Sequence, residues 1–156
     1  MRFPLKKIFL VAAVVVVAMQ FIRPARNLSA TPPGKDDLAT IYPPPPAVRQ
    51  LLEAACYDCH SNNTRYPWYT NVQPVGWWLK SHIDEGKDKL NFSEFGTYSL
   101  NRQGKRFGAI ADQLTDRTMP LKSYTWIHRD AVFTVAQNLS LIEWAESMQD
   151  KVEGGN

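Results

Sequence analysis

The chain has 156 residues, 44% of them hydrophobic, with 18 Lys and Arg, 15 Asp and Glu and only two cysteines. Residues 1–30 contain five basic residues and no acidic residue. Residues 31–156 therefore hold 13 basic and 15 acidic residues. This slightly acidic remainder excludes a nucleic-acid-binding protein, which needs a basic stripe with interleaved aromatics. Two cysteines also exclude a disulfide-rich scaffold.

The N-terminal segment is apolar from residue 8 to residue 22 apart from Gln20, and basic residues flank it on both sides. This pattern predicts a signal-anchor or signal peptide over residues 1–26. A membrane span usually needs about 20 apolar residues, so residues 3–5 would have to extend the run. The flanking charges place the following domain on the periplasmic side of the bacterial cytoplasmic membrane, anchored by residues 8–22. The alternative is a cleaved, soluble periplasmic protein, with Leu28-Ser29-Ala30 as the nearest weak cleavage site.

Residues 27–46 are rich in Ser, Thr, Pro, Gly and Asp and end in four consecutive prolines. Such a run favours polyproline II, so we expect a stiff linker that holds the domain away from the membrane. A proline-rich ligand for another domain is the alternative. A single domain is then expected over residues 47–150, followed by a flexible tail over residues 151–156.

Apolar residues recur at helical spacing along the domain, and no stretch alternates as a half-buried strand would. The sequence therefore predicts an all-α domain, preceded by an N-terminal hydrophobic helix. The expected helices run from about Val48 to the cysteines, from Pro74 to between Gly86 and Lys89, from a Ser93 or Ser99 cap to about Leu114, and from after Asp130 to about Met148.

The two cysteines form the motif Cys56-Tyr57-Asp58-Cys59-His60. C-x-x-C-H is the attachment signature for covalent haem. Two intervening residues let one helical turn present both thiols to the vinyl groups on one edge of the porphyrin. The histidine is then carried beneath the ring, where it can bind iron as the proximal ligand. The motif predicts one haem c, with Cys56 and Cys59 forming thioethers and His60 binding iron, inside a small cytochrome c-like helical domain.

Two other readings of the cysteine pair are weaker. A thioredoxin-like dithiol needs a βαβ context, which the helical pattern does not offer. A structural zinc site needs four ligands, and the chain has no second cysteine pair. The position of His60 directly after Cys59 favours haem attachment over the dithiol and the zinc site.

The second axial ligand of a haem iron is commonly Met or His. Met119, in a loop before Pro120, is the first candidate for the distal ligand, although a core methionine that fills a gap is the alternative. His82 is the alternative ligand, on the apolar face of the second helix. We expect His128 to orient its loop through a hydrogen bond, and Met148 to belong to the core.

The sequence resembles a family over roughly residues 30–150. The matching stretches are Cys56–Tyr69, Gln73–Val75, Trp77–Leu79, Glu85–Gly86, Leu90–Ser93, Met119–Pro120 and Tyr124–Ala131. They resemble the small bacterial haem-binding domain family of membrane-anchored or periplasmic c-type cytochromes. The resemblance implies a single c-type haem with His60 proximal and Met119 distal. Arg129 stands where the family usually has proline, which puts only the local turn in doubt.

These features favour a one-electron carrier in a membrane-associated respiratory or redox chain, more than a catalyst. Its redox partner protein is unknown. A haem-based sensor or a peroxidase with an open or weakly held sixth iron position is the alternative, for which His82 or Arg65 would supply a polar distal group. A third hypothesis is an interaction module in which haem mainly supplies core to a small domain.

Overall fold

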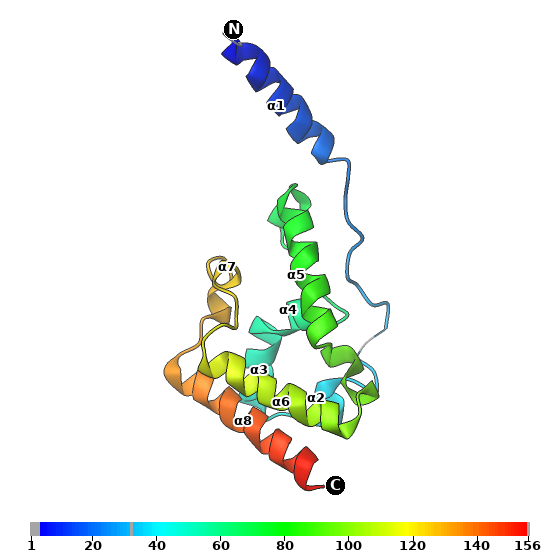
Figure 1. Ribbon diagram of the computed structural model, residues 1–156, viewed down its shortest axis with the longest axis vertical. Coiled ribbons are helices and arrows are strands. Elements are labelled where there is room, and N and C mark those ends of the chain that lie inside the picture. The colour runs from blue at the N-terminus through cyan, green and yellow to red at the C-terminus, as the bar shows by residue number, and fades with distance from the viewer. Residues whose placement is uncertain (1–3, 32, 156) are drawn as a thin grey trace.

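The computed structural model describes residues 4–31 and 33–155, and this part of the chain contains helices but no strand. Residues 1–3 of the expected signal segment, Pro32 of the expected linker and Asn156 of the expected tail lie outside the described residues. The expected all-α class is confirmed (Figure 1). The elements are α1 (Leu5–Met19), α2 (Leu38–Ile41), α3 (Pro46–Ala55), α4 (Tyr57–His60), η1 (Trp68–Asn71), α5 (Val75–Lys89), η2 (Phe92–Thr97), α6 (Leu100–Thr115), α7 (Lys122–Thr125), η3 (Arg129–Ala131) and α8 (Val135–Gly154).

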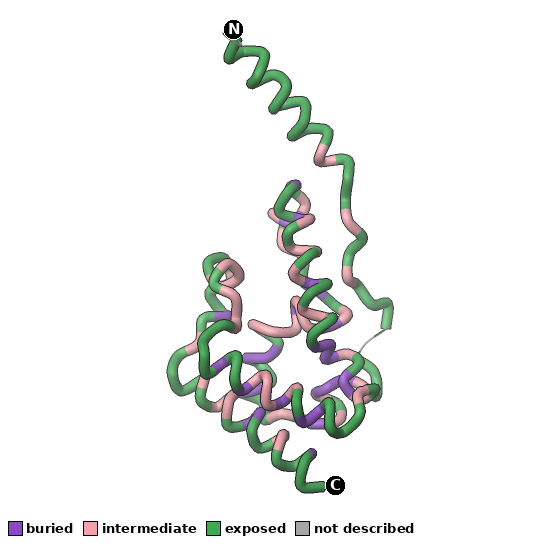
Figure 2. The backbone as a smooth tube through the Cα atoms, in the orientation of Figure 1, coloured by how far each residue is buried: buried purple, intermediate pink, exposed green. Residues whose placement is uncertain are grey.

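The N-terminal apolar run forms α1, a helix of 15 residues that extends away from the other helices (Figure 1). Its residues are exposed along almost the whole helix, as the tube in Figure 2 shows. Across residues 4–31 and 33–155, none of the helices combines the length and the apolar character needed to cross a membrane.

Helices α6 and α8 form an antiparallel pair at the base of the domain (Figure 1). A Cβ on Gly104 would come within 3.2 Å of Glu153, and a Cβ on Gly108 would come within 2.7 Å of the Gln149 amide. Both glycines lie on one face of α6, one turn apart, and they leave room for the Glu153 and Gln149 side chains of α8. Helix α3 packs against the same α8.

Aromatic rings fill the centre of the core. Phe107 on α6 lies 5.2 Å from the Tyr42 ring, 5.0 Å from Phe95 and 5.7 Å from Trp144, centroid to centroid. The buried Tyr42 hydroxyl donates to Oε1 of Gln103 at 2.6 Å, so the polar end of this ring is satisfied. A short helical domain has little apolar area, and large rings supply much of it.

The structure differs from the expected linker over residues 27–46, because part of this segment belongs to the core. Leu38 is fully buried and Tyr42 is nearly so. Asp37 caps α2 by accepting from the Ala39 N–H at 2.9 Å, and its burial raises the pKa of its carboxyl. The proline run ends as Pro46 opens α3, where a proline is tolerated because the first helical N–H has no intrahelical partner.

The last helix also differs from the expectation at both ends. Thr134 and Gln137 form a reciprocal capping box, so α8 begins at Val135 and not directly after Asp130. The helix continues to Gly154 through the residues expected to form a tail, because Val152 packs into the core. The expected cap at Ser99 is confirmed by its side chain, which accepts from the Arg102 N–H.

We expect Leu38→Ala to lower the free energy of unfolding by about 2–5 kcal/mol, the usual cost of deleting buried methyl groups together with the cavity left behind. The control is Leu139→Ala on α8, where the side chain is 50% exposed and the loss should stay within about 0.5 kcal/mol. Denaturant unfolding of the full chain measures both. Equal losses would show that residues 36–42 are not part of the core.

Candidate functional site

Cys56 interrupts the helix that precedes it, and the next four residues form the separate turn α4. Helix α3 ends at Ala55, and Cys56 adopts a non-helical backbone with φ −120° and ψ −43°. The N–H groups of Cys59 and His60 both donate to the Cys56 carbonyl, at 3.2 and 3.0 Å. The two thiols and the imidazole therefore stand on a single turn, and all three side chains are half-buried.

The His60 ring is held by the backbone that follows α5. Its Nδ1 lies 3.0 Å from the Leu90 carbonyl oxygen. Because a carbonyl can only accept, Nδ1 carries the proton and Nε2 keeps its lone pair. Burial lowers the pKa of His60, with hydrogen bonding to the backbone acting in the opposite direction. The hydrogen bond orients the ring and selects its tautomer, and the lowered pKa favours the neutral imidazole, the form in which histidine binds a metal.

Gly86 is the point at which α5 meets this turn. A Cβ at this position would lie 2.8 Å from the Cys59 carbonyl oxygen and 3.4 Å from the Cys59 Cβ. Any side chain here would push the helix and the turn apart. The glycine therefore permits the close approach that brings the Leu90 carbonyl to His60.

The pKa values of both thiols are shifted in the direction opposite to those of a reactive dithiol. Burial raises the pKa of Cys56 to about 12, with a smaller contribution from Cys59. Burial likewise raises the pKa of Cys59 to about 11, with the Asp58 charge adding to it. Reactive cysteines have lowered pKa values, since the thiolate is the nucleophile. No group of three His, Cys, Asp or Glu side chains that could hold a metal ion occurs in the described ranges, so a structural zinc site is also unsupported there.

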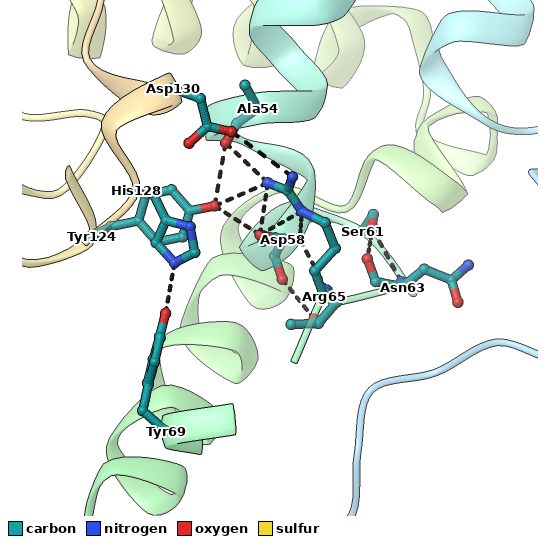
Figure 3. A network of polar contacts seen from close by, with 10 residues as sticks. Ala54, Asp58, Ser61, Asn63, Arg65, Tyr69, Tyr124, His128 and Asp130 are labelled. Carbon is teal, nitrogen blue, oxygen red and sulfur yellow. Dashed lines mark hydrogen bonds and ion pairs between the residues drawn. The ribbon is translucent and has the colours of Figure 1, made fainter. Parts of the chain in front are cut away.

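Asp58, between the two cysteines, is the centre of a polar network (Figure 3). Its buried carboxylate accepts from the Arg65 backbone N–H at 3.0 Å, from Arg65 Nε at 3.1 Å and from the Tyr124 hydroxyl at 2.7 Å. Its own carbonyl accepts from the Thr64 hydroxyl at 2.6 Å. Arg65 also donates to the Ala54 carbonyl at the end of α3. The network ties the cysteine turn to α3, to the segment after the turn and to α7.

The network continues from α7 to η1. The rings of Tyr124 and His128 stack at 4.1 Å with an angle of 10° between their planes. His128 Nε2 lies 2.7 Å from the Tyr69 hydroxyl, the hydrogen bond drawn in Figure 3. His128 thus makes a hydrogen bond of the kind expected of it, and it joins the loop after α7 to the start of the α5 region.

The two candidates for the distal ligand lie on different elements. Met119 is half-buried in the loop from α6 to α7, where its N–H donates to the Gln113 carbonyl at 3.3 Å. His82 lies on α5, one turn before Gly86, and its Nδ1 donates to the Trp78 carbonyl at 2.9 Å. Within the described residues, no hydrogen bond joins either side chain to the turn Cys56–His60.

These residues fit a covalently held haem. Two thiols and a neutral imidazole with a free Nε2 stand on one turn. Apolar rings are exposed on the flanking elements, with Trp78 on α5 and Trp126 directly after α7. A flat, apolar macrocycle needs such rings around it. The described residues contain no set of ligands for the alternative, a structural zinc site.

Sequence reasoning missed the residues that hold the turn in place. Asp58 occupies a variable position of the motif, and only its burial shows that it has a structural role. The contact with Leu90 uses a backbone carbonyl, which no pattern of side chains in the sequence could indicate. Gly86 did carry a signal, because an isolated glycine inside a helical pattern often marks close packing.

The family model described as a haem-binding domain matches residues 14–147. No curated protein and no solved structure matches the chain at a significant level.

We expect Gly86→Ala to lower the free energy of unfolding by about 1–3 kcal/mol, the usual cost of an overpacked site, and to reduce the yield of any group attached at the cysteines. The matched control is Gly154→Ala, where a Cβ would meet nothing within 4 Å. Denaturant unfolding and mass spectrometry of the full chain measure the two effects. An unchanged stability in Gly86→Ala would contradict the close approach.

Tyr124→Phe should cost about 1–3 kcal/mol at neutral pH, because it removes a hydrogen bond to a buried carboxylate. Burial, followed by the bond to Asp58, raises the pKa of Tyr124 above its ordinary value near 10. The neutral hydroxyl therefore stabilises the fold fully below about pH 10, and this contribution is lost as the pH rises further. In Tyr124→Phe the loss of stability above pH 10 should be less steep than in wild type. Identical slopes would show that Tyr124 does not keep its proton in the fold.

Proposed function

Because the chain belongs to the haem-binding domain family, we propose that it carries one haem c and serves as a one-electron carrier. Cys56 and Cys59 form the thioether bonds, His60 is the proximal iron ligand and Met119 is the distal ligand. When bound, the haem supplies an iron that accepts and releases a single electron. The chain's own residues decide how that iron is held and what can reach it.

The observation that carries this proposal is the hydrogen bond between His60 Nδ1 and the Leu90 carbonyl. It fixes the ring, places the proton on Nδ1 and leaves Nε2 as the metal-binding atom. Outer-shell bonds of this kind orient metal-binding histidines and raise their basicity. Asp58, through Arg65 and Tyr124, restrains the same turn from the opposite side.

Met119 supports the carrier function more than a catalytic one. With His60 and Met119 both bound to the iron, no position would be left for a substrate, and the methionine would raise the reduction potential. The loop that holds Met119 is bonded back to α6 through Gln113, so the thioether is presented from an ordered backbone.

The cellular location is part of the proposal. The acid-free, basic and apolar N-terminus directs the chain across the cytoplasmic membrane and holds it on the periplasmic side. Cleavage to a soluble periplasmic form is the alternative. The redox partner would be a protein on the same side of the membrane.

A second candidate function rests on His82. Its Nδ1 is bonded to the Trp78 carbonyl, and the residue lies one turn from the contact between Gly86 and Cys59. A polar group there suits a sensor or a peroxidase whose sixth iron position is open or weakly held.

Absorption spectra of the full chain, exported with the haem-attachment machinery and kept in detergent, test these proposals. Wild type should be low-spin, with a methionine-to-iron charge-transfer band that Met119→Leu abolishes while lowering the reduction potential. The control is Met148→Leu, a half-buried methionine against the core, where the same volume-conserving change should leave the band in place.

Other results would favour the second candidate or reject the cofactor. A high-spin wild type, rapid carbon monoxide binding, or a spectrum that changes only in His82→Ala would replace the carrier with the sensor or peroxidase. Absence of covalent haem despite active attachment machinery would overturn the proposal at its centre.

A further inference from the structure

The chain between α1 and the domain is not a free tether. The Gln20 amide pairs in both directions with the Gln73 backbone: its Nε2 donates to the Gln73 carbonyl at 3.2 Å, and its Oε1 accepts from the Gln73 N–H at 2.9 Å. Trp77 Nε1 donates to the Ile22 carbonyl at 2.8 Å. The end of α1 is therefore attached to the turn from which α5 begins (Figure 1).

The attachment continues along the next residues. Arg26 donates to the Asn71 side chain at 2.7 Å, and the Asn27 carbonyl accepts from the Thr64 N–H at 3.0 Å. Lys87 donates to the Asn27 side chain at 2.8 Å. Since these contacts extend from Gln20 to Asn27, the orientation of the domain relative to α1 is defined by the fold.

Large apolar side chains are exposed at the same end of the domain. We call them the junction patch, which consists of Phe21, Ile22, Trp68, Val72 and Val75. Phe21 is 84% exposed and Val72, beside Gln73, is 46% exposed. The patch is continuous with α1, whose apolar side chains are exposed on all sides. Exposed apolar side chains that gather at one end of a domain indicate an interaction site.

The charges around the junction patch indicate what covers it. Arg23 directly follows Ile22 and Arg26 comes three residues later, and both line a hollow with Lys80 of α5. The first acidic residue in the chain is Asp36. An apolar surface bordered by arginines and carrying a tryptophan suits the boundary of a bilayer, where aromatic rings lie at headgroup level and basic side chains can contact lipid phosphates.

We propose that the junction patch, together with the exposed apolar side chains of α1, rests on an anionic lipid bilayer, so that the η1 end of the domain faces the membrane in a fixed orientation. This inference rests on the proposed membrane attachment of the N-terminal segment. It adds a second lipid contact within the domain itself, and it turns the α6–α8 pair away from the membrane.

Photo-crosslinking of the full chain in vesicles containing phosphatidylglycerol tests the proposal. p-Benzoylphenylalanine replaces Val72 in one variant and Val135 in the control, where the side chain is 68% exposed at the start of α8. We expect lipid adducts at position 72, detected by mass spectrometry, at least tenfold above those at position 135. Arg23→Gln with Arg26→Gln should reduce the adducts at position 72.

Each outcome decides the proposal. Vesicle flotation without lipid adducts at position 72, equal adducts at both positions, or crosslinks at position 72 to a second protein chain would overturn it. A chain that does not float would overturn both this inference and the membrane attachment. Haem absorbance in the same sample reports separately on the proposed cofactor, so its failure cannot be mistaken for failure of the lipid contact.

Discussion

The structure depends on how the turn Cys56–His60 is held between α5 and α7. On one side Gly86 allows α5 to touch Cys59, and the Leu90 carbonyl after that helix accepts a hydrogen bond from His60 Nδ1. On the other side the Asp58 carboxylate is buried, which is costly unless the charge is paired and hydrogen-bonded. Arg65 and Tyr124 supply those bonds. The buried carboxylate therefore holds α3, the segment after the turn and α7 around the turn, because Arg65 also donates to Ala54 at the end of α3.

This arrangement gives the site its chemical character. Half-buried thiols with raised pKa values are poor nucleophiles, whereas an imidazole whose Nδ1–H donates to a carbonyl is a good metal ligand through Nε2. The family match to a haem-binding domain agrees with this set of donors. The stack of Tyr124 on His128, and the bond from His128 to Tyr69, connect the same turn to η1, the element that begins with Trp68 of the junction patch.

Much of the helical pattern could be predicted from the residues, and the failures have physical causes. The start of α5 after Pro74 and the Ser99 cap were found because they depend on local chemistry. The segment over residues 27–46 was misjudged because its composition is that of a linker, while Leu38 and Tyr42 find their partners on η2 and α6. The end of α8 was placed too early because Val152 is stabilised by packing and not by helical periodicity alone.

By itself, the sequence determined the helical class, the C-x-x-C-H motif and the one-sided charge of the N-terminus, because each depends on residues close together in the chain. Only the tertiary structure decided which ring nitrogen of His60 is free, since its partner Leu90 lies 30 positions later. It also decided that Asp58 is buried and that Gln20 is bonded to Gln73, across 53 positions. Contacts of this range depend on how the helices pack, and local patterns in a single sequence do not specify that packing.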